Sequence, residues 1–224
     1  ITPFVAKATP EQCDVPSEDH GLQCNPYVKS RMCDLDKDEK NKWKSNSTHI
    51  NIAIFKGLSG WQEFYKQDPD MAIMCAIDHA QAQGVLSDMI VEPVFADDES
   101  SESGGAKAAL CMRNGGLDFA VGPFGSAIAL NAGIIGKLFK INMIGTVTSS
   151  PLLSNKDPAS GFPYFSRVFP SDLFQSKLVA EMAKQFNITK VATFSQSPQA
   201  YYDGIVNAFH SFAGELGMKT MSVT

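Results

Sequence analysis

The chain has 224 residues, of which 44% are hydrophobic, and a formal net charge of -5 at pH 7. Its length and apolar content suffice for one large folded domain or two modest ones, and they exclude a disordered chain. Because no run of basic residues accompanies the negative charge, a nucleic-acid-binding function is excluded as well.

Residues 1–48 are predicted to form an N-terminal extension with three of the five cysteines, Cys13, Cys24 and Cys33. This segment is too polar to be held by burial, and its cysteine spacings do not match a C-x(2–4)-C zinc pair, so at least one disulfide is expected. The bond could reach Cys75 or Cys111, although both could equally be buried apolar cysteines. Since five is odd, one thiol is expected to stay free or to pair with another chain.

Disulfides favour an oxidising compartment, and the glycosylation sequons at Asn46 and Asn187 agree with secretion. The sequence contains no run of about 18 apolar residues that would span a membrane, and its N-terminus lacks the order of a signal peptide. We therefore expect an extracellular or cell-surface protein, with any leader or membrane anchor removed or outside this chain.

From residue 49 onward, strand patterns alternate with helix patterns. Strands are predicted at 49–55, 88–97, 117–122, 141–147 and 164–169, and helices at 70–84, 103–116 and 126–140. After a break at about 169–171, the pattern resumes with helices at 172–186 and 201–216 and strands at 190–195 and 219–224. This alternation predicts an α/β fold, a parallel sheet covered by helices on both faces in three layers.

Polar clusters follow two consecutive strands, at the edge of a parallel sheet where ligands bind. Ser126 begins a helix after "GPFG", so its hydroxyl is expected to cap that helix, whose free N–H groups and dipole attract an anion such as a carboxylate. Thr148, Ser149 and Ser150 follow the next strand, in a loop that Pro151 keeps out of a helix. A plain helix cap and an ordinary turn are the alternative interpretations.

The segment from Gly125 to Asp172, with its motifs "SSPLLS" and "FPYFSRVFPSD", resembles the extracellular ligand-binding module of natriuretic-peptide receptors and class C G-protein-coupled receptors. Within that family, residues 190–219 and the "SGW" after the first strand are most similar to metabotropic gamma-aminobutyric acid (GABA-B) receptors. The resemblance covers roughly residues 50–223. It implies a flytrap related to type I periplasmic binding proteins, with lobe 1 at 49–169 and an incomplete start of lobe 2 at 170–224.

By position, the resemblance implies that Ser126 and Ser149 hold a ligand carboxylate and that Trp61 covers the ligand. Local packing is the alternative for Trp61. Phe169 stands where the receptors have a hinge histidine, which removes a polar contact. The residues that would hold the ligand's amine are expected later than Thr224.

The predicted helix 126–140 carries apolar residues over about half of its circumference, more than one buried face needs. Because the family commonly dimerises through lobe 1 helices, Ile135 and Phe139 are expected to contact another subunit in a homo- or heterodimer. Burial within the domain is the alternative interpretation.

Enzyme motifs such as the P-loop, G-x-S-x-G and H-E-x-x-H are absent from the sequence, so we expect no active site, cofactor or metal. The acidic run 97–102 is interpreted as a solvated loop rather than a calcium site. The expected function is that of a cell-surface receptor flytrap for a small amino-acid-like ligand. The alternatives are a flytrap without ligand that serves as a structural or assembly module of a surface glycoprotein, and a periplasmic-type solute-binding protein.

Overall fold

The computed structural model describes residues 33, 40, 42–46, 48–65, 68–85, 89–117, 119–197 and 199–223. Cys13 and Cys24 lie outside the described residues. The described strands form a five-stranded sheet in the order β2-β1-β3-β4-β5 and a two-stranded sheet of β6 and β7. All of these strand pairs are parallel, which confirms the predicted α/β fold.

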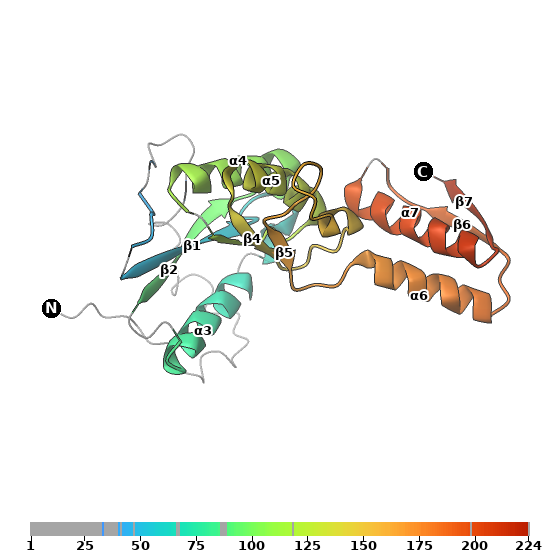
Figure 1. Cartoon of the computed structure of the whole chain (residues 1–224), viewed down its shortest axis with the longest axis horizontal. Helices are drawn as coiled ribbons and strands as arrows, with labels where there is room; N and C mark the ends of the chain where they lie inside the picture. The colour runs from blue at the N-terminus through green and yellow to red at the C-terminus, as the bar shows by residue number, and fades with distance from the viewer. Residues whose placement is uncertain are drawn as a thin grey trace.

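The larger sheet lies between two helical layers. Its strands are β1 (His49–Lys56), β2 (Ile90–Asp97), β3 (Phe119–Val121), β4 (Asn142–Gly145) and β5 (Phe165–Arg167). One face carries α3 (Asp68–Ala82), and the opposite face carries α4 (Glu102–Asn114) and α5 (Ser126–Phe139) (Figure 1). Two short 3-10 helices, η1 (Gly60–Tyr65) and η2 (Pro151–Ser154), were not predicted, because such short segments show no periodicity.

The core between this sheet and α4 and α5 consists largely of small side chains. Ala109 in α4 and Ala129 and Ala132 in α5 are completely buried. A Cβ atom on Gly105 would lie 2.5 Å from Cγ2 of Ile128, so the two helices touch at this glycine. This close packing fixes the first turn of α5 at the carboxyl end of β3.

The strand order places the topological switch point of the sheet between β1 and β3. From β1 the chain passes through α3 to β2 on one side, and α4 then returns it to β3 on the other side. Open α/β sheets bind ligands outside the carboxyl ends of their strands at such a point. The loops after β1 and β3 are therefore the candidate location of a binding site.

The second unit contains α6 (Asp172–Gln185), β6 (Lys190–Phe194), α7 (Ala200–Glu215) and β7 (Lys219–Val223). It begins after the segment 168–171, near the predicted lobe boundary at 169, which stays a prediction. Phe209 and Ala213 of α7 form a small core with Ala180 of α6 and Met218.

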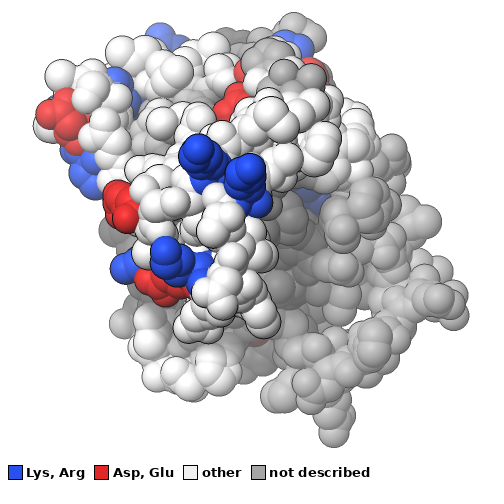
Figure 2. Space-filling model, turned by 90° about the vertical axis from the view of Figure 1, so that its right-hand side faces the viewer, with Lys and Arg blue, Asp and Glu red and all other residues white. Residues whose placement is uncertain are grey.

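One face of the two-stranded sheet is open among the described residues. Phe194, Met221 and Val223 are exposed on it, and Phe174 and Phe186 are exposed at the two ends of α6. Figure 2 looks at this end of the molecule, where uncharged side chains form most of the described surface. Parallel sheets are normally covered on both faces. Among the described residues, helices therefore pack on only one of the two faces of this sheet.

A disulfide joins Cys33 to Cys111 in α4, which confirms the prediction of at least one disulfide in the extension and identifies Cys111 as a partner. Cys75 is also disulfide-bonded, so neither Cys75 nor Cys111 is a free buried thiol. The backbone N–H of Cys33 donates to the carbonyl of Phe95 at 2.7 Å. The extension is therefore anchored both to α4 and to the edge strand β2.

In the part of the chain that the structure describes, no helix has the length and apolar character needed to cross a membrane.

Candidate ligand-binding site

The ends of β3 and β4 bring Ser126 and the loop 148–150 together, as the sequence predicts. The Oγ atom of Ser126 accepts hydrogen bonds from the backbone N–H groups of Ser149 at 3.2 Å and Ser150 at 3.1 Å. The predicted helix cap is wrong, because Gly125 is the N-cap of α5 and the Ser126 hydroxyl bonds the neighbouring loop instead. Ser126 thus fixes the shape of that loop.

Replacing Ser126 by alanine is expected to lower the free energy of unfolding by roughly 2–6 kcal/mol. The reason is that two buried N–H groups lose their acceptor, at about 1–3 kcal/mol each. Urea denaturation measures the loss. The control is Ser101→Ala, since Ser101 does cap a helix by accepting a bond from the Gly104 N–H at 3.0 Å, and a lost cap costs about 1 kcal/mol. Equal losses of unfolding free energy in both variants would show that Ser126 contributes no more to stability than a helix cap does.

Thr148 and Ser150 are completely buried, and their hydroxyls have no hydrogen-bond partner among the described residues. Arg167 of β5 holds their loop, since its Nη1 donates to the carbonyls of Thr148 at 3.2 Å and Ser150 at 2.8 Å. A Cβ on Gly204 of α7 would lie 3.0 Å from Pro151. Glycine at this position lets α7 of the second unit approach the loop of the first.

Asp172, the first residue of α6, completes the cluster from the second unit. Its backbone N–H donates to the carbonyl of Ser149 at 2.9 Å, and its carboxylate accepts a hydrogen bond from the Ser149 side chain. Burial raises the pKa of Asp172 above its ordinary value, although the Ser149 bond and the charge of Arg167 act to lower it. Its Oδ2 atom is buried with no partner in the described part of the chain.

Tyr201, in the first turn of α7, lies in the electrostatic reach of this carboxylate. Burial raises the pKa of the Tyr201 hydroxyl, and the negative charge of Asp172 raises it further. The sequence analysis named neither Asp172 nor Tyr201 as a site residue. It expected the residues that hold the ligand's amine only after Thr224, whereas both of these residues come before it. The available signal for Asp172 was an acidic residue at the first position of a helix that follows the break between the two units.

The two aromatic candidates are both accessible to a ligand. Trp61 lies in η1 after β1 and is 64% exposed, so its ring is not packed into the domain as the alternative interpretation required. Phe169 is 44% exposed in the segment between β5 and α6. Trp61 is thus free to cover a ligand at the switch point, and Phe169 lies where the two units join.

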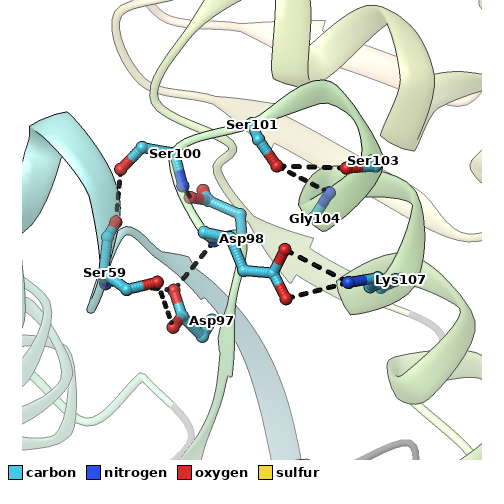
Figure 3. Close-up of polar contacts among 9 residues, drawn as sticks. Ser59, Asp97, Asp98, Ser100, Ser101, Ser103, Gly104 and Lys107 are labelled. Atoms are coloured by element: carbon cyan, nitrogen blue, oxygen red, sulfur yellow. Dashed lines mark hydrogen bonds and ion pairs between the residues drawn. The ribbon is translucent and has the colours of Figure 1, made fainter.

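The acidic run after β2 forms a hydrogen-bonded network with the loop after β1 (Figure 3). Asp97 accepts bonds from the N–H of Leu58 at 3.0 Å and from the hydroxyl of Ser59 at 2.9 Å. Glu99 pairs with Lys107 of α4 at 3.0 Å. The Asp97 contacts join the loop after β1 to the end of β2, and the Glu99 pair ties the acidic run to α4.

The interpretation of this run as a solvated loop is wrong for Asp98. This residue is completely buried, and burial raises its pKa to about 6 even though its carboxylate accepts a bond from the Ser100 N–H. The described residues contain no group of three or more histidine, cysteine, aspartate or glutamate side chains placed to hold a metal ion.

Sequence comparison identifies relatives of this chain. Residues 68–224 match the family model described as "Receptor family ligand binding region". The chain is 31% identical over 97 residues to metabotropic glutamate receptor 4 of Rattus norvegicus, covering 43% of this chain and 10% of that receptor. The same receptor of Macaca fascicularis is 32% identical over 89 residues, which cover 40% of this chain and 9% of that receptor. The particular similarity to GABA-B receptors stays a prediction.

Solved structures show the same fold. A leucine-binding protein of Thermotoga maritima matches with a TM-score of 0.61 at 24% identity, covering 78% of this chain and 48% of that one. An ABC transporter substrate-binding protein of Desulfitobacterium hafniense, in complex with Leu, matches with a TM-score of 0.61 at 21% identity, covering 78% and 50%. The chain spans about half the length of these binding proteins and about a tenth of the receptors. It belongs to the family of receptor ligand-binding regions and has the fold of a periplasmic binding protein.

Proposed function

We propose that this chain forms the main part of the binding site of a cell-surface receptor flytrap that recognises a small amino acid. One observation carries the proposal: the buried Oδ2 of Asp172 lacks a partner among the described residues, and the backbone N–H of Asp172 bonds Ser149, whose own N–H bonds Ser126 in the first turn of α5. A negative side chain and a positive helix end in one place suit a ligand with an amine and a carboxylate.

The hydrogen bonds of the two serines support a different proposed role for each. Ser126 accepts two N–H bonds, which use the lone pairs of its hydroxyl and leave the O–H hydrogen to donate to a carboxylate. Ser149 donates to Asp172, so its oxygen can still accept a bond from an amine. The proposed roles differ from the expectation that both serines hold the carboxylate, because Ser149 now contacts the amine. Residues that recognise the amine are thus proposed within this chain.

The names of the relatives agree with this ligand class. The similar receptors are named for glutamate, and the Desulfitobacterium protein was solved with Leu. The experiment is a calorimetric screen of the full-length protein against glycine, L-leucine, L-glutamate and gamma-aminobutyric acid. At least one α-amino acid should bind. Binding of none would overturn the proposal and favour a structural module without ligand.

We also propose that the exposed apolar residues of α5 contact a second subunit. Ile134, Leu138 and Phe139 are exposed, and Ile135 is half-buried against the core, so the expected contact around Ile135 and Phe139 stays a proposal. Analytical ultracentrifugation of the full-length protein should show a dimer that Leu138→Glu dissociates. A monomer in both cases would contradict this interface, and Leu178→Glu on the exposed side of α6 is the matched control.

The remaining parts of the proposed function concern location. Asn46 and Asn187 are exposed, as carriers of glycans must be, and the disulfides fit an oxidising compartment. The proposed protein is a receptor module rather than an enzyme, and any membrane contact lies in segments outside this chain.

A further inference from the structure

Gln62 has a buried side chain whose amide group forms no hydrogen bond with the described residues. It follows Trp61 in η1 and is 3% exposed, yet neither its Oε1 nor its Nε2 has a hydrogen-bond partner among the described residues. Buried amide groups are nearly always paired, because leaving them unpaired costs free energy. A ligand that completes the site would supply the missing partner.

The position of Gln62 is fixed through its backbone. Its N–H donates to Oγ of Ser100 at 3.1 Å, and that hydroxyl donates to the carbonyl of Ser59 at 2.7 Å, a contact drawn in Figure 3. The loop after β2 therefore holds η1 firmly, and the side chain of Gln62 points inward from a rigid turn.

The amide lies between two glycines that follow neighbouring strands. A Cβ on Gly57, after β1, would lie 3.1 Å from Oε1, and a Cβ on Gly125, after β3, would lie 3.5 Å from Nε2. Since β1 and β3 flank the topological switch point, Gln62 spans the place where this class of sheet binds ligands.

The chemistry on the Gly125 side is that of an anion site. Gly125 is the N-cap of α5 and has no side chain with which to satisfy the first N–H groups of the helix. The helix dipole, these N–H groups and the Nε2 donor of Gln62 favour a negative charge at one point. A carboxylate satisfies all of them.

We propose that Gln62 donates a hydrogen bond from Nε2 to the ligand's carboxylate at the start of α5, and so makes the site selective for acids over their amides. The inference rests on the proposed function, because it names a further contact for the same ligand. Gln62 is a ligand-contacting residue in this account, whereas Ser100 positions it.

The test titrates the full-length protein with L-leucine, L-glutamate and the α-carboxamide of each. The wild type should bind one of the acids and prefer it to its amide. Gln62→Leu should lose about ten- to a hundredfold in affinity for the acid, since a bond to a charged group is lost, with little change for the amide. Gln62→Glu should lose more, because its carboxylate repels that of the ligand. Gln83→Glu, the same charge change at an exposed residue of the α3 end, should bind like the wild type.

The outcomes separate the two proposals. If the wild type binds no amino acid of the screen, the proposed function fails and this inference falls with it. If it binds another amino acid of the screen, that acid and its amide replace L-leucine and L-glutamate in the titration. If the wild type binds but Gln62→Leu keeps its preference for the acid, this inference alone is overturned. Gln62→Met, also apolar but unbranched, is the second variant should Gln62→Leu not fold. An equal loss for acid and amide would show a purely structural role and would overturn the inference too.

Discussion

Replacing Asp172 by asparagine is expected to weaken amino-acid binding by about thirtyfold or more. Loss of one partner from a buried charge pair costs about 2–5 kcal/mol, because the other charge stays desolvated and unpaired. Asparagine keeps the size of the side chain and removes its charge. Calorimetric titration with the amino acid that the wild type binds measures the change.

The same substitution should have the opposite effect on the protein without ligand. Burial raises the pKa of Asp172, so the folded chain binds this proton more tightly than the unfolded chain does. The free energy of unfolding of the wild type should therefore fall as the pH rises from the ordinary aspartate pKa through the raised one. Asp172→Asn lacks this dependence and should be at least as stable at neutral pH.

The control for Asp172 is Asp203→Asn in the first turn of α7. Asp203 accepts a hydrogen bond from the N–H of Gln199 at 2.9 Å and takes no part in the proposed site. Its substitution should leave affinity unchanged. An Asp172→Asn protein that binds as tightly as the wild type would remove Asp172 from the site.

Removing the disulfide between Cys33 and Cys111 is expected to lower the free energy of unfolding by about 4 kcal/mol. The two cysteines are 78 residues apart, so the bond closes a long loop and strongly restricts the unfolded chain. Guanidinium denaturation of the Cys33→Ala, Cys111→Ala double variant under oxidising conditions measures this loss.

The single variant Cys75→Ala serves as a comparison, because it removes a different disulfide and leaves this one in place. Peptide mapping without reductant should recover Cys33 and Cys111 in one linked fragment. Recovery of both as free thiols would contradict the predicted bond.

The order of the elements could be predicted from the sequence, because apolar periodicity is a local property of each segment. The runs around β1, β2 and α5 show it clearly, and their bounds differ from the predicted ones by a few residues. The hydrogen bonds of Ser126 could not be predicted, since its two donors lie more than twenty residues further along the chain. A serine at a helix start predicts a cap when only its neighbours are known.

Burial of single polar residues was the other property that the sequence did not reveal. Asp98 belongs to an acidic run typical of exposed loops, yet it is completely buried and its N–H donates to the carbonyl of Lys56 at the end of β1. Gln62 follows an exposed tryptophan and gives no sign of its own burial. Asp172 was visible as an acidic residue at a helix start, but attraction to the helix dipole explains that position equally well. In each case the contacts come from segments distant in sequence.

The glycine at position 204 also has a consequence for natural variation. Every missense change of a glycine codon adds at least one carbon, and a Cβ here would already lie 3.0 Å from Pro151. Substitutions at this codon can therefore only add bulk between α7 and Pro151 of the serine loop. Larger side chains would hold the two units further apart. Variants at this codon should therefore form a graded series, from small residues that are tolerated to large residues that keep Asp172 away from the site.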